Sequence, residues 1–289
     1  MPSTYAHYRF GQEVLRALPE ELQTIAKKHL PLYHIGLHGP DILFYYKPLT
    51  HHRVNQLGYL LHKRNASVFF RKSLAILQKM PDPEAGLAYL LGFICHFALD
   101  SECHGYIEYK IKHSNMTHTE IESDFDRKLL RDGGYNPKRT CLTSHICPRE
   151  GDTETIAMFF PSLREKHIQK ALSSMIFYNK LLLAPTQGKR DYVLSLLRIT
   201  GHYKEIQGLL MPEYPRPGCE DSTRELTRRY KNGIPIAVWL CENYYNTFCE
   251  MDVLSSRFHR TYGPDEVEIK KYENGVSQEL LNSLRSTTL

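Results

Sequence analysis

The most constraining feature of this sequence is an apolar segment, residues 86–99, which reads GLAYLLGFICHFAL. The helix that this segment predicts is apolar on every side and should therefore be buried. Three polar residues are spaced by four: His96 lies within this segment, and Asp100 and His104 come after it. This spacing places them along one face of the helix. An ionised aspartate in such a place is costly unless it is paired or bound to a metal. The segment therefore predicts a buried helix with one hydrogen-bonded or metal-binding face.

Apolar spacings of three and four residues recur along the whole chain, whereas the alternating patterns typical of strands are scarce. We therefore expect an all-α fold, a multi-helix bundle. The expected helices lie near residues 4–18, 66–79, 84–108, 117–131, 152–183, 189–210, 221–252 and 264–286. The chain should form a single all-helical domain, residues 1–289, with a metal-site half of about 1–132 and a C-terminal helical half of about 152–289.

The composition limits where the chain can reside and what it can bind. No apolar stretch reaches the roughly 20 residues that span a bilayer, so no transmembrane segment is expected. The N-terminus lacks the basic start and apolar run of a secretory signal, and the seven cysteines form no CxxC pair; both features favour reduced thiols and a cytoplasmic protein. The net charge of +5 comes from Lys and Arg interspersed with acids, which permits a phosphate-bearing ligand but predicts no stable nucleic-acid binding.

The helix expected over residues 117–131 carries two more polar residues on its apolar stripe. On a helical wheel, His118 and Glu122 lie on the same side as Phe125 and Leu129. The side chains that point away, toward the expected solvent face, are Glu120, Ser123, Asp124, Arg127 and Lys128. The stripe therefore predicts that His118 and Glu122 face the protein interior.

The first helix repeats this pattern, since His7 lies on one stripe with Phe10, Val14 and Leu18. A single buried histidine with a hydrogen-bond partner is more often structural than a ligand. Here three helices each point a His, or a His with a carboxylate, into the expected core. Together they favour a polynuclear metal site, for which iron or manganese would also be compatible with the ligands.

Other polar residues show weaker signals. Asp41 follows Gly39-Pro40, and on local evidence alone it is better explained by a turn or a helix cap. Possible ligands without a discriminating periodicity are His34, His38, His51, His52 and His62, of which His62 is the best placed. Histidines expected to be solvated or structural are His113, His145, His167, His202 and His259. The phosphate-binding, dinucleotide, serine-hydrolase and HExxH motifs are absent, which disfavours those reaction classes.

Taken as a series, these residues resemble the zinc-dependent phospholipase C family over about the first 125 positions. The matching positions are His7, the aspartate of Gly39-Pro40-Asp41, His62, the series His96, Asp100 and His104, and the pair His118 and Glu122. The resemblance implies an all-helical bundle of the phospholipase C and zinc nuclease type, with two or three zinc ions that hydrolyse a phosphodiester bond.

The resemblance also assigns roles to the matching residues. It implies that His104, His118 and Glu122 hold the more exposed, hydrolytic zinc. It implies that Asp41, His62 and His96 hold a second zinc, and that Asp100 bridges to a third, which His7 binds. Asp41 and Glu122 are the expected catalytic residues, with Asp41 as general base toward the attacking water.

The chain departs from the family pattern in two places. The histidine after Asp100 follows it by four residues, where the family usually has six. Secreted members use the amine of an N-terminal tryptophan as a ligand, whereas this chain begins Met-Pro-Ser. The amine of Pro2, after removal of the methionine, would be the equivalent ligand here.

The resulting prediction is a phospholipase C-like, metal-dependent phosphoric ester hydrolase that acts on a phosphodiester, with phospholipid as the first candidate substrate. One alternative is a nuclease or nucleotide phosphodiesterase on the same site. Another is a non-catalytic helical protein whose ions only stabilise its core. Catalysis requires an open coordination position at the ion held by His104, His118 and Glu122. The sequence does not indicate an oligomeric state.

Overall fold

The computed structural model of the chain describes residues 4–48 and 50–263. These residues contain no strand, and the structure is 70% helical, which confirms the predicted all-α fold. The α-helices are α1 (Thr4–Ala17), α2 (Glu20–Lys28), α3 (Leu30–Gly36), α4 (Arg53–Lys63), α5 (Ala66–Leu77), α6 (Pro83–Lys112), α7 (His118–Asp132), α8 (Asp152–Met158), α9 (Glu165–Leu182), α10 (Gln187–Ile199), α11 (Tyr203–Ile206) and α12 (Glu220–Phe248). Three 3-10 helices are η1 (Gly39–Tyr45), η2 (Gln207–Leu209) and η3 (Ser256–His259).

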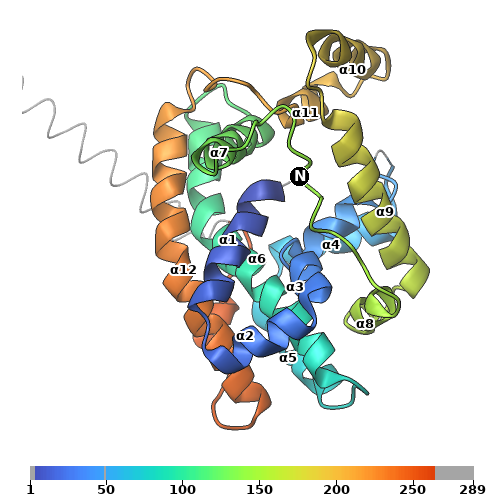
Figure 1. The fold of residues 1–289 in the computed structure, drawn as a ribbon, viewed down its shortest axis with the longest axis vertical. Helices are drawn as coiled ribbons and strands as arrows, with labels where there is room; N and C mark the ends of the chain where they lie inside the picture. Colours follow the sequence, from blue (N-terminus) through green and yellow to red (C-terminus); the bar gives the residue numbers. More distant parts are fainter. Residues whose placement is uncertain (1–3, 49, 264–289) are drawn as a thin grey trace, which may run out of the picture.

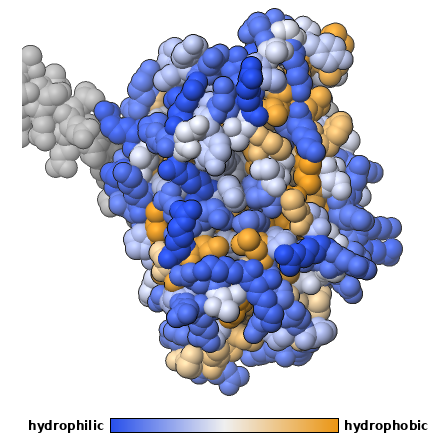
Figure 2. Space-filling view, in the orientation of Figure 1, coloured by the Kyte–Doolittle hydropathy of each residue, from blue (hydrophilic) through white to orange (hydrophobic). Residues whose placement is uncertain are grey.

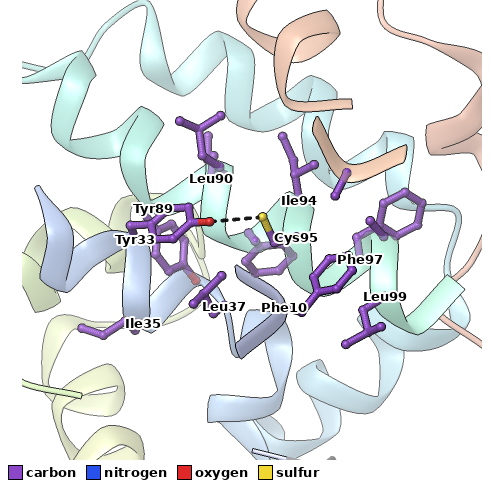
Figure 3. Close-up of a cluster of buried hydrophobic side chains, with 14 of the residues drawn as sticks. Phe10, Tyr33, Ile35, Leu37, Tyr89, Leu90, Ile94, Cys95, Phe97 and Leu99 are labelled. Atoms are coloured by element: carbon purple, nitrogen blue, oxygen red, sulfur yellow. Dashed lines mark hydrogen bonds between the residues drawn. The ribbon is translucent and has the colours of Figure 1, made fainter. Parts of the chain in front are cut away.

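Helix α6 runs through the middle of the molecule, as its apolar sequence predicts, with α12 alongside it and α1, α2 and α3 packed against it (Figure 1). Its side chains join those of α1 and α3 in the core shown in Figure 3. There the Tyr33 hydroxyl lies 3.5 Å from Cys95 Sγ and donates to the Gly11 carbonyl at 2.7 Å. The Tyr33 hydroxyl is thus satisfied within the core, whereas the buried Tyr89 hydroxyl has no hydrogen-bond partner among the described residues.

Two glycines allow the backbones of α3 and α6 to come into direct contact. A Cβ on Gly36 would lie 2.1 Å from the Tyr89 carbonyl oxygen, and one on Gly92 would lie 2.2 Å from that of Tyr33. The following glycine, Gly39, has a positive φ of +47°, which glycine adopts more readily than other residues. This close crossing brings η1, which follows α3, against the middle of α6.

Several predicted boundaries were wrong. The single helix expected over residues 152–183 is two helices, α8 and α9, because Pro161 cannot extend the first of them. The helix expected over 189–210 ends at Ile199, where Gly201 takes a φ of +77° and stops it. The sequence analysis missed α2, α3 and α4; α2 and α3 are short and begin without a side-chain cap. The helix expected over 264–286 lies outside the described residues.

The prediction that the outer face of α7 is exposed to solvent was also wrong in part. Thr117 caps this helix with a capping box, as expected. However, Ser123, Asp124 and Arg127, which were expected to face solvent, are buried. The start of α12 and the segment before it cover this face, so that Asp124 accepts hydrogen bonds from Arg127, from the Arg216 N–H and from the Thr223 hydroxyl.

No helix among the described residues combines the length and the apolar character needed to cross a bilayer. All seven cysteines have free thiols. The organisation of residues 1–289 as one domain stays a prediction.

Candidate metal centre

Asp100 is the centre of the polar cluster in the core. Its neighbours on α6, His96 and His104, lie one turn before and one turn after it. The distances are 3.1 Å from His96 Nε2 to Asp100 Oδ2 and 3.6 Å from His104 Nε2 to Asp100 Oδ1. Asp100 and His96 are buried, because α6 is covered on every side at this level. The four-residue spacing therefore presents all three side chains to one another.

Helix α1 contributes His7, which completes a first group with His96 and Asp100. His7 Nε2 lies 3.2 Å from Asp100 Oδ1, and its ring stacks on that of His96 at 4.2 Å between centroids. The start of α1 is fixed by Asp126 of α7, whose carboxylate accepts the backbone N–H groups of Tyr5 and Ala6 at 3.0 and 2.7 Å. This anchor determines where His7 enters the core.

A second group comprises Asp41 from η1, His62 from α4, and His96. His62 Nε2 lies 2.8 Å from Asp41 Oδ1, and His96 Nε2 lies 3.7 Å from Asp41 Oδ2. Asp41 is only 1% exposed. The close crossing of α3 and α6 therefore places a third element, η1, in contact with the cluster.

The third group, His104, His118 and Glu122, lies nearer the surface. Glu122 Oε1 lies 3.1 Å from His118 Nε2 and 3.5 Å from His104 Nε2. The His118 side chain is 33% exposed, more than any other member of the three groups. This is the group through which a ligand from solvent could reach the cluster.

The rings are held so that their Nε2 atoms face the cluster. Nδ1 donates a hydrogen bond to a backbone carbonyl in three of them: His62 to Gly58 at 2.8 Å, His96 to Leu37 at 3.3 Å, and His104 to Tyr262 at 2.9 Å. The Nδ1 of His118 lies 3.8 Å from the carboxylate of Glu108. A neutral imidazole that donates from Nδ1 keeps a lone pair on Nε2, which is how metal-binding histidines are oriented in proteins.

Several buried atoms of the cluster have no hydrogen-bond partner of acceptable geometry among the described residues. They are His7 Nδ1, Asp41 Oδ1 and Oδ2, His96 Nε2, Asp100 Oδ2, His104 Nε2 and Glu122 Oε2. Unpaired buried atoms of this kind are rare and costly. Donors bound at about 2.0–2.1 Å in a tetrahedral shell lie roughly 3.3 Å apart, which is close to the spacing seen here. A small cavity also lies among His7, Asp100, His104 and Glu122. The residues therefore fit metal ions.

The electrostatics of the cluster agree with this fit. Burial alone would raise the pKa of Asp100, but the surrounding histidines outweigh it and hold that pKa well below its usual range. Burial would likewise raise the pKa of Glu122, and His118 and His104 lower it. Burial lowers the pKa of His118, whereas Glu122 and Glu108 raise it to about 10. The Asp100 and Glu122 carboxylates are thus ionised, and the histidines beside them bind either a proton or a metal ion.

The structure brings all eight expected ligands into these three groups, and His96, which was expected only beside Asp41 and His62, also joins His7 and Asp100. Their binding of metal stays a prediction. The amine of Pro2 lies outside the described residues. Of the other histidines considered, His51 is exposed and His52 caps α4 through its Nδ1. His38 lies apart from the three groups, against His145, with their Nε2 atoms 2.7 Å apart.

Sequence reasoning missed two residues that orient the cluster. Glu108 continues the four-residue series of α6 beyond His104, and this spacing could have identified it. Tyr262, whose carbonyl holds His104, is fully buried and its ring lies 5.3 Å from that of His62. No local pattern marks Tyr262, because it reaches the site from 158 residues along the chain.

A cleft reaches the third group from the surface. Its cavity volume is about 50 Å³, and Glu122 and Asp126 lie along it. Most of the other lining residues are apolar or carry small hydroxyls and amides: Thr4, Tyr45, Thr119, Ser123, Pro137, Thr140, Leu142, Asn179, Leu182, Leu183, Leu209 and Met211. The cleft thus joins a polar end beside the cluster to an apolar wall.

Comparison with known proteins gives one match. Residues 6–172 match the sequence model of a family described as zinc dependent phospholipase C. This region includes all eight expected ligands and ends within α9. No curated protein and no solved structure matches the chain.

Proposed function

Since the chain belongs to the zinc-dependent phospholipase C family, we propose that it hydrolyses the phosphodiester bond of a phospholipid at a zinc site formed by the three groups. The observation that carries this proposal is the convergence of eight His, Asp and Glu side chains, six of which have a buried nitrogen or oxygen atom without a hydrogen-bond partner. Such a donor set suits zinc, with iron or manganese as the other candidates.

The third group is the proposed hydrolytic site. His104, His118 and Glu122 supply three donors, as each of the other two groups does, and a zinc ion held by three donors keeps a fourth position for water or substrate. Zinc held there would supply a water nucleophile at neutral pH and positive charge for a phosphoryl oxygen. This group is also the most exposed and opens to the cleft. These features support catalysis over the alternative of a non-catalytic metal-binding protein.

The chain's own residues prepare this site. The Tyr262 carbonyl fixes the orientation of His104, and Glu108 orients His118. Asp100 ties the groups together because its two oxygens face histidines of α1, α4 and α6. We keep Asp41 as the proposed general base, a role that a carboxylate side chain can fill.

The cleft supports a lipid as the substrate. Its wall carries Leu142, Leu182, Leu183, Leu209 and Met211, and among the described lining residues the only aromatic side chain is Tyr45. Stacking of nucleobases needs aromatic platforms, whereas acyl chains need apolar walls. The cleft therefore favours a phospholipid over the nuclease alternative. The cytoplasm stays the predicted compartment, and the free thiols are compatible with it.

The test combines metal content with hydrolysis. We expect two or three zinc ions per wild-type chain after loading, and cleavage of a water-soluble short-chain phospholipid. Glu122→Gln should bind at least one ion fewer and lose at least about a hundredfold in kcat/KM, since it removes a proposed ligand.

The matched control is Glu120→Gln, the same change two residues earlier on α7. Glu120 belongs to the capping box, which accepts glutamine, and makes no contact with the cluster. This variant should keep the wild-type metal content and activity. A wild-type chain that binds no zinc under replete conditions would overturn the proposal, as would equal activity of the two variants.

A further inference from the structure

Helix α10 carries an apolar stripe that the protein leaves exposed. Tyr192, Leu196 and Ile199 are spaced by four and three residues, so their side chains lie on one side of the helix. Their exposed fractions are 68%, 41% and 83%. Single exposed apolar residues are ordinary, but a row of three large ones on one helix face indicates an interaction surface.

The opposite side of α10 is already packed. Val193 is buried with Ala184 and Leu210 in a small cluster that is separate from the main core, and Leu194 and Leu197 lie against it. The apolar surface of α10 is therefore wider than the surface that the fold covers. The exposed stripe contributes nothing to this packing, which leaves it available to a partner.

The helix pair α9 and α10 is strongly basic. It contains six Lys and Arg residues and two acids, so it carries a net +4 of the chain's formal +5. Both acids already have hydrogen-bond partners: Glu165 accepts from Thr153 and Asp191 from Gln187. A second copy of this chain would bring the same positive charge, whereas an anionic surface would be complementary to it.

The segments before and after α10 lead to the proposed active site. Leu182 and Leu183 precede α10 and Leu209 and Met211 follow α11, and all four line the cleft. Figure 1 shows α10 and α11 at the top of the molecule, next to the end of α9. In the same view, Figure 2 shows apolar side chains along the upper right, over α9 and α10, on a largely polar face.

From these observations we propose that α10 docks on an anionic phospholipid surface. Tyr192, Leu196 and Ile199 enter the interface between headgroups and acyl chains, while the exposed lysines of α9 contact the headgroups. Docking in this way would turn the mouth of the cleft toward the lipid. This inference rests on the proposed function, because docking on a lipid surface would serve a phospholipase. Its test measures vesicle binding and does not require catalysis.

The experiment measures flotation of the full chain with vesicles of phosphatidylcholine containing phosphatidylserine. The variant Tyr192→Ser/Leu196→Ser/Ile199→Ser should bind about thirtyfold or more weakly than wild type, since it removes the apolar area that would leave water. The matched control is Met251→Ser/Val253→Ser, in the loop after α12, at the opposite end of the molecule in Figure 1. Val253 is 79% exposed, similar to Ile199. This control should bind as wild type does.

A second variant tests the contribution of positive charge to vesicle binding. Lys170 and Lys180 are exposed on α9. Lys170→Gln/Lys180→Gln should weaken binding to the mixed vesicles by about fivefold per lysine removed, and should leave the weaker binding to pure phosphatidylcholine unchanged. Equal losses on both kinds of vesicle would contradict the role assigned to charge.

The outcomes separate this inference from the proposed function. Equal vesicle binding by wild type and the α10 variant overturns the inference, whatever the activity. A dimeric wild type that the α10 variant converts to monomer, with vesicle binding unchanged, also overturns it and identifies a second copy as the partner. Loss of vesicle binding with full cleavage of a soluble short-chain phospholipid supports both proposals. Loss of binding by a chain that cleaves no phosphodiester supports the docking surface and overturns the function.

Discussion

His145 illustrates what one buried side chain does far from the candidate metal centre. Its ring stacks on Tyr8 at 4.0 Å, and its Nε2 lies 2.7 Å from that of His38. Two imidazoles at this distance share one hydrogen, so both rings cannot be charged at once. Burial and then the charge of His34 lower the pKa of His145 to about 3, and burial holds the pKa of His38 well below its usual range.

This geometry predicts a loss of stability in acid. Between pH 6.5 and about 3, His145 takes up a proton in the unfolded chain but not in the folded one, so the free energy of unfolding falls as the pH falls. From pH 7 to pH 5 this one group should remove about 2 kcal/mol. Urea unfolding of zinc-loaded wild type and His145→Gln at both pH values measures it. The variant should lose about 1–2 kcal/mol less than wild type, and an equal loss in both proteins would contradict the assignment.

The sequence could not have identified this pair. His145 lies between two helices, where no apolar period indicates whether a side chain is buried, and its partner is 107 residues away. The ligand histidines are different, because His7, His96 and His118 lie on apolar helix stripes that local spacing shows. The buried position of a histidine was therefore predictable where a helix supplied an apolar periodicity. It was not predictable for His145, which lies in a loop and contacts a residue far away in the sequence.

At the scale of helices, the crossing of α3 and α6 is the contact that most affects the site. We expect Gly92→Ala to lower the free energy of unfolding by about 2–3 kcal/mol, because the new Cβ would meet the Tyr33 carbonyl, which belongs to a helix backbone and cannot move alone. The matched control is Gly188→Ala on α10, where a Cβ meets nothing within 4 Å. That change should raise stability by about 0.5–1 kcal/mol. Urea unfolding compares them, and equal effects would argue against the close crossing.

Helices α1 and α7 were predictable because each has a regular apolar stripe, and α6 because its sequence is apolar on every side; α6 and α7 also have a capping residue within the local sequence. The burial of the α7 face that carries Asp124 was not predictable, because Thr223, which covers it, lies 99 positions away in the sequence. Local spacing indicates which side of a helix is apolar. It does not show that a polar side will be covered and paired, as Asp124 is with Arg127.

At the scale of the whole molecule, the candidate site draws its side chains from α1, η1, α4, α6 and α7, and a supporting carbonyl from Tyr262, which follows η3. The sequence indicated the ligands, because a series of His and carboxylate residues resembles a known family. It did not indicate Tyr262, which lies outside the region that matches the family. Occupation of such a site would connect most of the fold.

Removal of metal should therefore destabilise the entire chain. A ligand that binds only the folded state at about a thousandfold excess over its Kd stabilises it by about 4 kcal/mol, which raises the unfolding temperature by roughly 10 °C in a protein of this size. We expect that difference between zinc-loaded and chelator-treated wild type in thermal unfolding. Asp100→Asn should abolish most of it, because Asp100 contacts histidines in all three groups. Asp132→Asn, at the end of α7, should retain it. An unfolding temperature that zinc does not change would show that the eight side chains hold no metal.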